Sequence, residues 1–515
     1  MIEEPHDGRG SGANGKCRCN RRTGKRVITL RKQPSFLKVI ADDEVERIHQ
    51  MSLLILSEIG VHFPNGEMLD RLEAIGVEVD REDQIAKFPP EVVEKTLTRI
   101  PKNFSICPAD GGPPIKLGDG KLQLSMDQTP DIVDYMTNKK SGRATGEILK
   151  GIAVANALEH VRLASGYCLP NDIPQPAGDV IAFQLLWTYS KKAVGNWIYS
   201  ADSGKVILEM AKVIAGSKEE LRRRKLISYF AEPISPLRWS EHSLEIVLLL
   251  IEHECPIYLG PMVTTGGSGP VTLAGTLAMH HAEILQGMVM VYACNPNQPL
   301  IYSCHAHRLD MSRGIILYGA PEQALLACGA TQLAKRFGFA VAGNVMLHDS
   351  NCPDYMAGFE SGATAAYALA AGWDMLGFVG FGTIGVVGSG VAHSLEQVII
   401  QDEALGYLER MIGSFEVNAD TLAYEVIKDV GIGGNFFAEV HTAKHLRSQL
   451  WQDKGIFKAM DYDKWREGGA ESTLDRAHRK LTEILERDLP LEPVISSKQV
   501  KELERIAKKY IDELK

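Results

Sequence analysis

The chain has 515 residues, of which 45% are hydrophobic, so it can bury a large core. Its net charge of −9 argues against nucleic acid as the main partner. Nine scattered cysteines without a CxxC pair indicate reduced thiols, as in a cytoplasmic protein. The longest uninterrupted aliphatic run, residues 246–251, is far shorter than the ~20 residues that cross a bilayer. Composition therefore predicts a cytoplasmic globular protein without a membrane segment.

The first part of the chain is predicted to be a tail followed by a mixed region. Residues 1–34 are rich in Gly, Arg and Asn and have no periodic apolar face, which predicts a disordered basic tail. Residues 35–155 mix short strands and helices, and we predict an N-terminal α/β region there. One helix is predicted to begin near Asp42 and to end at Gly60, and a second begins at the Pro89-Pro90 pair.

Seven short apolar strand candidates alternate with helical stretches over the next part of the chain. They are residues 162–167, 193–199, 226–230, 257–260, 300–304, 340–345 and 375–379. Spacings of about 30–40 residues are typical of βα units, which build an open doubly wound sheet or a closed barrel. We predict an α/β fold with a TIM (β/α)8 barrel over residues 156–440. An eighth strand near residues 386–394 would close it, and residues 441–515 would form a C-terminal helical cap.

The motif GFGTIG at residues 380–385 fits the GxGxxG fingerprint of dinucleotide-binding proteins. In that fold the last glycine opens a helix whose N-terminus holds the pyrophosphate. Here Gly388 and Gly390 continue the loop, and the first helical pattern begins only at Leu395. We therefore interpret the segment as a glycine-lined loop at the mouth of the barrel, where the active sites of such barrels lie.

Residues with functional side chains lie at or just past the ends of the strand candidates and would face the same mouth. They are Trp197, Tyr199, Phe230, Glu232, Tyr302, His305, His307, His348 and Asp349. In one interpretation His305 and His307 chelate a metal, with His348 and Asp349 completing its shell, as in barrel hydrolases. In the other, one His is a hydrogen-bonding wall residue and its neighbour packs in a loop. No convincing further acidic or lysine ligand follows a middle strand, so no metal site is predicted.

Several blocks of sequence, in the same order, resemble the trimethylamine:corrinoid methyltransferase family. They are residues 44–49, 58–61, 269–278, 320–322, 332–334, 353–358, 394–397, 402–403, 441–445 and 450–451. The resemblance implies a TIM barrel that moves a methyl group from a methylated amine to the cobalt(I) of a separate corrinoid protein, without a tightly bound cofactor of its own. The founding members carry pyrrolysine, whereas this chain has only standard residues. It is therefore similar to the branch that demethylates quaternary amines such as glycine betaine.

Within this resemblance, His348 and Asp349 are predicted to be catalytic, because they follow the sixth strand candidate. Aromatic faces hold quaternary ammonium groups, so the substrate-binding residues are predicted at the strand ends. These are Trp197, Tyr199, Phe230, Tyr302, His305 and His307. A substrate carboxylate would bind Arg308, Arg313 or the backbone amides of residues 264–269.

Two glycine-dense loops are predicted to form the rim on which the corrinoid protein docks. Their glycines are Gly266, Gly267, Gly269, Gly380, Gly382 and Gly385. A homo-oligomer is compatible with this arrangement. Two other functions stay open at this point: a metal-dependent hydrolase built on the histidines, and a non-catalytic protein that senses betaines.

Overall fold

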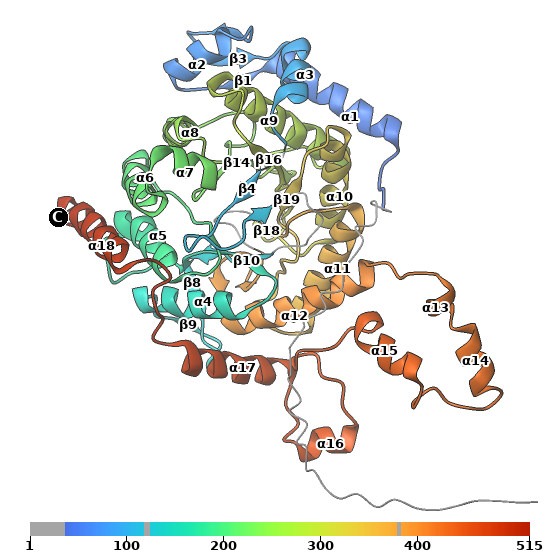
Figure 1. Cartoon of the computed structure of the whole chain (residues 1–515). Helices are drawn as coiled ribbons and strands as arrows, with labels where there is room; N and C mark the ends of the chain where they lie inside the picture. The colour runs from blue at the N-terminus through green and yellow to red at the C-terminus, as the bar shows by residue number, and fades with distance from the viewer. Residues whose placement is uncertain (1–36, 103, 118–123, 378–382, 515) are drawn as a thin grey trace, which may run out of the picture. The chain divides into compact units, whose positions relative to one another are not determined.

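The computed structural model describes residues 37–102, 104–117, 124–377 and 383–514 (Figure 1). The chain divides into two compact units, and the smaller one contains residues 416–450. The described part of the larger unit comprises residues 37–102, 104–117, 124–377, 383–415 and 451–514. The boundary predicted at residue 440 therefore lies inside the smaller unit. Among the described helices, none combines the length and the apolar character needed to cross a membrane.

The N-terminal part of the larger unit consists of helices, a small antiparallel sheet in the order β1-β3-β2 and a hairpin of β4 with β5. These elements are α1 (Asp42–Leu54), β1 (Val61–His62), α2 (Gly66–Glu73), β2 (Glu78–Asp80), β3 (Ile85–Lys87), α3 (Pro90–Arg99), β4 (Ser105–Ile106) and β5 (Ile115–Lys116). The Glu44 carboxylate accepts the Ala41 amide at 2.8 Å and so caps the start of α1. A π-helical turn and Gly60 end it. The predicted limits of this helix are confirmed.

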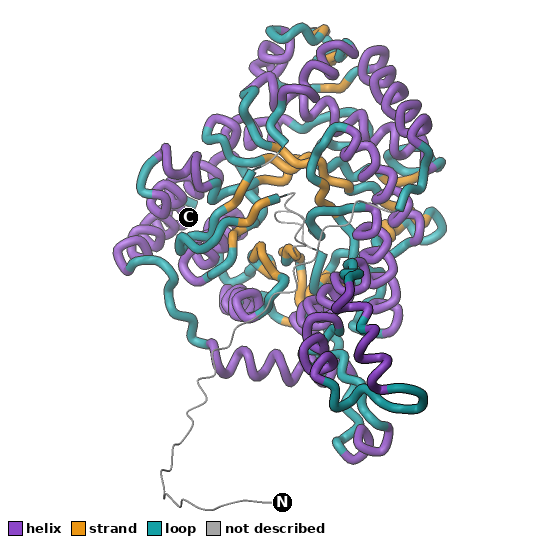
Figure 2. The backbone as a smooth tube through the Cα atoms, turned by 45° about the vertical axis from the view of Figure 1, so that its right-hand side comes forward, coloured by secondary structure: helices purple, strands orange, loops and turns teal. Residues whose placement is uncertain are grey.

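Short parallel strands lie at the centre of the larger unit, and Figure 2 shows helices around them. The strands are β6 (Leu124–Ser125), β10 (Val161–Ala164), β12 (Ala193–Val194), β13 (Tyr229–Ala231), β14 (Ile257–Leu259), β16 (Leu300–Cys304) and β19 (Val341–Gly343). They form a sheet in the order β12-β10-β6 and a second in the order β13-β14-β16-β19. Six of the strands predicted from the sequence are present at their expected positions.

Residues 375–377 join the two sheets. The amide of Met375 donates to the Val341 carbonyl at 3.2 Å, and the Ser125 amide donates to the Leu376 carbonyl at 3.2 Å. Hydrogen bonds therefore connect eight strand segments in one series from β12 to β13. The ladders between described residues do not link β12 to β13, so the sheets alone do not show a closed barrel.

The prediction of an eighth strand at residues 386–394 is wrong. That stretch forms two short strands, β20 (Val386–Val387) and β21 (Ala392–His393), which pair antiparallel with each other. The strand missing from the prediction is β6, which lies in the region assigned to the N-terminal α/β part. It has only two residues, too few to show the alternation of apolar and polar residues that signals a strand.

The helices that follow the central strands pack against one another in sequence order. They are α4 (Thr145–Ala157), α5 (Gly178–Tyr189), α6 (Ala201–Ala215), α7 (Lys218–Arg224), α8 (Glu241–Glu252), α9 (Leu273–Cys294), α10 (Pro321–Arg336), α11 (Tyr355–Ala371) and α12 (Leu395–Ile412). If α7 is left out, each of these helices contacts the next one along the chain. The last helix, α12, contacts the first, α4. Eight helices therefore form a closed ring.

Short strands follow the central ones at their carboxyl ends. They are β7 (Gln128–Thr129), β8 (Asp131–Val133), β9 (Lys140–Ser141), β11 (Tyr167–Cys168), β15 (Thr264–Thr265), β17 (His307–Asp310) and β18 (Ile315–Leu317). The larger unit ends with α16 (Tyr462–Glu467), α17 (Thr473–Asp488) and α18 (Ser497–Glu513), which lie in the region predicted to form the helical cap. The smaller unit contains α13 (Ala419–Leu422), α14 (Tyr424–Val430) and α15 (Val440–Gln449).

Candidate functional site

The central strands share one apolar face, which we call the apolar layer. Its residues form one buried cluster: Leu163, Ala193, Phe230, Tyr258, Ile301, Ala342 and Met375. Ile106 and Ile115 of the β4–β5 hairpin belong to the same cluster. Residues on neighbouring strands that pair in register share a face, as Phe230, Tyr258 and Ile301 do. Apart from β6, one side of each of these strands therefore packs into a common interior.

Two residues further along several of these strands, the same face becomes polar. Side chains alternate between the two faces of a strand, so Ser303 on β16 continues the face of the apolar layer. Ser165, Glu232 and Asn344 come directly after β10, β13 and β19, two residues past members of the apolar layer. We call these four residues the polar layer. Gly260 lies between them, and a Cβ there would come within 2.4 Å of the Phe230 ring and 3.0 Å of Ser303 Cβ. The side-chain polar atoms of Ser165, Ser303 and Asn344 are buried without a hydrogen-bond partner among the described residues. Such groups are normally paired, so they mark a surface suited to a polar ligand.

Glu232 is the ionisable member of the polar layer. It follows β13 directly, and its Oε1 lies 3.8 Å from Nδ1 of His305. Burial raises the pKa of Glu232 to about 8, and the nearby Glu283 carboxylate adds to this effect. The side chain nevertheless keeps 33% of its surface accessible, which leaves the carboxyl group open to a ligand. His305 is sealed, and burial holds the pKa of its imidazole well below 6.5. The histidine is therefore neutral at pH 7 and places no positive charge beside Glu232.

His307 is held in one tautomer. The Gln323 side-chain amide donates to the Asn344 carbonyl, so its oxygen faces His307 and accepts from Nδ1 at 2.8 Å. The lone pair of His307 is consequently on Nε2, which is buried without a hydrogen-bond partner in the described structure. Burial lowers the pKa of His307 to about 4. The centroid of its ring lies 4.8 Å from the centroid of the His305 ring and 4.4 Å from that of the Tyr318 ring.

The electrostatic environment of these rings is acidic. Burial raises the pKa of the Tyr318 hydroxyl, and the Glu232, Asp127 and Asp349 carboxylates raise it further, in that order. Three acidic side chains thus act on one phenol beside His307. Together with the neutral histidines, this arrangement favours a cationic ligand.

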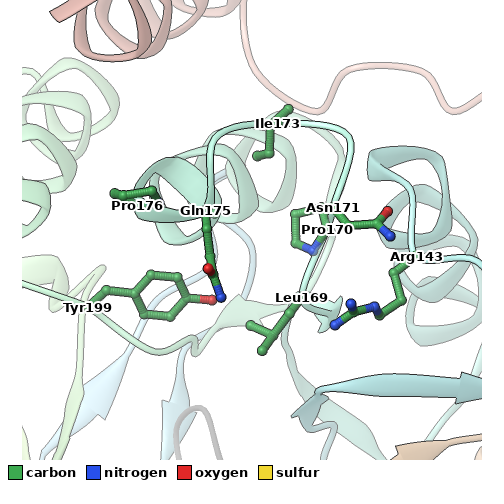
Figure 3. A pocket seen from close by; sticks show the side chains of 9 residues that line it. Arg143, Leu169, Pro170, Asn171, Ile173, Gln175, Pro176 and Tyr199 are labelled. Carbon is green, nitrogen blue, oxygen red and sulfur yellow. The ribbon is translucent and has the colours of Figure 1, made fainter. Parts of the chain in front are cut away.

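The predicted aromatic residues lie in different places. The Trp197 and Phe230 rings meet edge to face with centroids 6.0 Å apart, and Phe230 lies 5.7 Å from the His305 ring. Tyr199 instead donates its hydroxyl to Gln128 at 3.3 Å and lines a separate pocket of about 650 Å³. Figure 3 shows Tyr199 and Arg143 approaching this pocket from opposite sides. Trp197 and Phe230 therefore belong to the site around Glu232, and Tyr199 belongs to the neighbouring pocket.

Tyr302 points away from the polar layer. Its hydroxyl makes a 3.1 Å hydrogen bond with Nδ1 of His281 on α9, and it packs in the core between strands and helices. His305 lies three residues further along, on the opposite face. The geometry therefore gives no support to the predicted role of Tyr302 in substrate binding. His281 and its neighbour His280 are both buried.

His348 and Asp349 have distinct surroundings. The Asp349 carboxylate accepts hydrogen bonds from the amides of Tyr318 at 2.8 Å and Gly319 at 3.0 Å, and from the Ser389 hydroxyl at 2.8 Å. These bonds brace two loops and fix the backbone at Tyr318. His348 is fully buried, and burial lowers the pKa of its imidazole to about 4.

The loop at residues 264–269 is a tight turn closed by its own backbone. The amides of Gly266, Gly267 and Gly269 all donate within the turn, at 3.0 to 3.1 Å, so they are not free to bind a carboxylate. Gly266 has φ +72°, and a Cβ there would overlap the methyl group of Met311. The predicted docking glycines Gly380 and Gly382 lie outside the described residues, and Gly385 packs against the His393 ring.

Neither predicted arginine is a free cation. Arg308 contacts the Glu322 carboxylate at 3.3 Å, and Arg313 contacts Asp310 at 2.6 Å. The four residues of the metal interpretation also do not form a ligand set. Over the described ranges, the one group of three or more side chains suited to a metal is Asp420, His441 and His445.

Comparison with known proteins decides the family. The model of the trimethylamine methyltransferase (MTTB) family matches residues 7–513. The chain belongs to this family. It is 27% identical over 466 residues to a glycine betaine methyltransferase of Desulfitobacterium hafniense strain Y51, covering 89% of this chain and 95% of that protein. A trimethylamine methyltransferase MttB of D. hafniense strain DCB-2 is 26% identical, and the match covers 87% of this chain and 90% of that protein. The monomethylamine methyltransferase MtmB of Methanosarcina barkeri is a distant structural neighbour, with a TM-score of 0.44, 12% identity and coverage of 86% and 92%.

In this member of the trimethylamine methyltransferase family, the main residue that sequence reasoning passed over is Glu232. It had been recognised as a residue at a strand end, but no role was assigned to it. The signal was available, because Glu232 stands two residues after Phe230 and therefore on the same face of the strand. Its raised pKa and its position beside His305 emerge only from the packing of separate strands.

Proposed function

We propose that this member of the family moves a methyl group from a quaternary, betaine-like amine to the cobalt(I) of a separate corrinoid protein. The observation that carries the proposal is the acidic interior around Glu232, with aromatic rings beside it and neutral histidines. A quaternary ammonium group has no N–H to donate, so it is held by negative charge and by ring faces. Phe230 and Trp197 supply the rings, and Glu232 supplies the charge.

Binding of the cation and ionisation of Glu232 support each other. The free site holds Glu232 with a pKa of about 8, so much of the carboxyl group is protonated at pH 7. A bound cation favours the carboxylate and lowers that pKa, because opposite charges attract strongly away from solvent. The substrate thereby enters a site that carries little unpaired charge before binding.

The chemistry requires positioning more than an activated side chain. The cobalt(I) of the partner supplies the electron pair that forms the carbon–cobalt bond, and the pair of the broken C–N bond stays on nitrogen, so a neutral tertiary amine leaves. The residues of this chain hold the ammonium centre, exclude water and fix the direction of the N–CH₃ bond. Asp349 contributes by bracing the backbone at Tyr318, next to His307.

The proposed architecture is a TIM barrel. Eight strand segments in one hydrogen-bonded series, a shared apolar interior and a closed ring of eight helices support it. No strand ladder among the described residues joins β12 to β13, so the proposal that the barrel closes between these two strands is based on the closed ring of helices. In such a barrel the polar layer lies toward the carboxyl ends of the strands, where the active sites of this architecture lie.

The corrinoid protein is proposed to dock on the loops at those strand ends. Large apolar side chains are exposed on residues that follow β14, β16 and β19: Val271, Met311, Tyr355 and Phe359. Tyr355 and Phe359 stack on each other, and Met311 and Val271 both lie beside Gly266. Exposed apolar residues that gather in this way are typical of interaction surfaces. The turn at residues 264–269 carries Gly266 against Met311, which makes it part of the same surface.

The test combines the purified protein, a corrinoid protein held as cobalt(I), and glycine betaine, carnitine, proline betaine or trimethylamine. Methylation of cobalt is followed by absorbance. We expect methylation with at least one quaternary amine. Methylation by trimethylamine alone would contradict the substrate class, and no methylation by any of them, with a corrinoid partner encoded beside this chain, would contradict the activity.

A further inference from the structure

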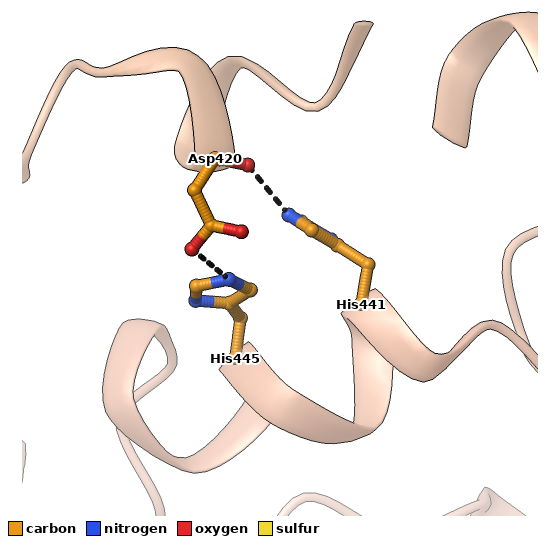
Figure 4. Close-up of side chains that lie close together, drawn as sticks. All are labelled: Asp420, His441 and His445. Atoms are coloured by element: carbon orange, nitrogen blue, oxygen red, sulfur yellow. Dashed lines mark hydrogen bonds and ion pairs between the residues drawn. The ribbon is translucent and has the colours of Figure 1, made fainter. Parts of the chain in front are cut away.

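Three potential metal ligands converge in the smaller unit, far in sequence from the residues around Glu232. His441 and His445 lie one turn apart on α15, and their ring centroids are 4.4 Å apart. Asp420 on α13 faces both of them, as Figure 4 shows. One ligand atom from each of the three residues can be chosen so that all lie within 4.8 Å of one another. In a tetrahedral zinc site the ligand atoms lie closer together than this limit, so the three side chains would move toward one another on binding.

We propose that Asp420, His441 and His445 bind a divalent cation of the zinc type, with a fourth position left for water. Two imidazoles and one carboxylate are ligands that Zn²⁺ accepts, and a spacing of four residues places both histidines on one face of a helix. The site is separate from the proposed methyl transfer and does not depend on it.

The hydrogen bonds already orient one ligand. Nε2 of His441 lies 3.0 Å from the Asp420 backbone carbonyl, which can only accept, so this nitrogen carries the proton. The lone pair of His441 is therefore on Nδ1. A metal-bound histidine usually donates its other N–H to a carbonyl or carboxylate, and His441 has that arrangement. Nε2 of His445 lies 3.1 Å from Oδ2 of Asp420.

Lys444 is the competitor in this cluster. Its Nζ lies 2.8 and 2.7 Å from the two carboxylate oxygens of Asp420. An incoming cation must share Asp420 with this ammonium group or displace it. Replacing Lys444 therefore distinguishes a metal site from a simple ion-pair cluster. The replacement should strengthen metal binding at Asp420, whereas it would remove an ion pair from a cluster that holds no metal.

The described helices of the smaller unit lack a buried core that would hold them together. None of the residues of α13, α14 or α15 is buried, and Ile432, Phe437 and Val440 are largely exposed. A segment of this size without an apolar core is held by other means, of which a metal is one. A cation at Asp420 would tie α13 to α15 and convert binding energy into order of the segment.

The experiment uses the full-length protein, stripped with a chelator and titrated with Zn²⁺ by calorimetry at pH 7.5. Elemental analysis after gel filtration gives the number of ions retained. We expect one equivalent that is lost in the double variant His441→Gln and His445→Gln, and retained in His253→Gln, which changes a histidine of the larger unit. Asp420→Asn should weaken binding by at least about tenfold. Circular dichroism checks that each variant is folded.

The variant Lys444→Gln and hydrogen exchange complete the test. Lys444→Gln should bind Zn²⁺ more tightly than the unchanged protein, and Zn²⁺ should slow amide exchange in α13 and α15 unless both histidines are replaced. Binding that is absent at micromolar Zn²⁺, or equal in the double-histidine variant, would overturn the proposal. Weaker binding in Lys444→Gln would show an ion-pair cluster and would overturn it as well.

Discussion

The apolar layer lies on the central strands, and the polar layer follows two residues later, at or just past the carboxyl ends of those strands, with a different chemistry. Tyr258 and Ile301 pack in a buried cluster, whereas Glu232 and Ser303 face an interior with unpaired polar atoms. The difference teaches that one step of strand alternation separates the part of the molecule that stabilises the fold from the part that binds. Changes in the first layer should therefore affect unfolding, and changes in the second should affect ligand affinity.

The largest effect is expected from the apolar layer. Ile301 is 1% exposed, and Ile301→Ala removes buried methyl groups and leaves a cavity. We expect the free energy of unfolding to fall by about 2–5 kcal/mol. Ser303→Ala on the same strand is the matched control, and it should leave stability almost unchanged because the Ser303 hydroxyl has no hydrogen bond to lose. Chemical denaturation of both variants checks the pair, and equal destabilisation would remove the distinction between the layers.

The next effect concerns Glu232→Gln, which keeps the shape of the side chain and removes its charge. We expect the affinity for a quaternary amine to fall by about 1.5–3 kcal/mol, roughly 10- to 150-fold, because the cation loses its charged partner. Calorimetric titration with glycine betaine measures the change. Glu322→Gln alters a carboxylate that contacts Arg308 outside the polar layer and should bind normally. Equal affinity in the unchanged protein and in both variants would show that the ligand does not bind at Glu232.

A smaller effect is expected for Asp349→Asn. This change weakens three hydrogen bonds that brace the loops beside Tyr318. We expect a loss of about 1–2 kcal/mol in the free energy of unfolding, with ligand affinity within about twofold of the unchanged protein. A large loss of turnover at unchanged thermal stability would instead support the catalytic role that the sequence suggested.

The smallest effect is a shift in pH dependence. The Glu283 carboxylate raises the pKa of Glu232, so Glu283→Gln should lower that pKa and move the midpoint of ligand binding toward lower pH. Stability follows the same group: between about pH 4.5 and 8 the folded protein holds a proton that the unfolded chain has lost. The contribution of Glu232 to stability therefore decreases as pH rises through this window, and Glu232→Gln should flatten the decrease. Thermal unfolding measured from pH 5 to pH 9 tests the sign.

Much of the fold was predictable because strand spacing and helix caps are local signals. The strand at residues 300–304 has its predicted limits, and α1 begins at Asp42, where the sequence predicts the start of a helix. Strand β6 and residues 375–377 were harder, because such short segments are defined by their hydrogen-bonded neighbours rather than by their own sequence.

The site was predictable only in part. His305 and Phe230 were selected because they follow strands, and both lie beside Glu232. Tyr302 is predicted with them, although it alternates with its neighbour Ser303 on β16 and therefore faces α9. Parity along a single strand could have excluded Tyr302. The raised pKa of Glu232 could not have been found in this way, because it depends first on burial by separate elements and then on the Glu283 carboxylate of α9.

The most direct test of the account is the affinity for glycine betaine as a function of pH. If Glu232 holds the ammonium group, affinity should rise as the pH increases toward about 8, where the carboxyl group ionises, and should then level off. Glu232→Gln should bind weakly at every pH and show no such rise. An affinity that is independent of pH in the unchanged protein, or a rise that persists in Glu232→Gln, would contradict the claim that Glu232 and its polar layer bind the methylated cation.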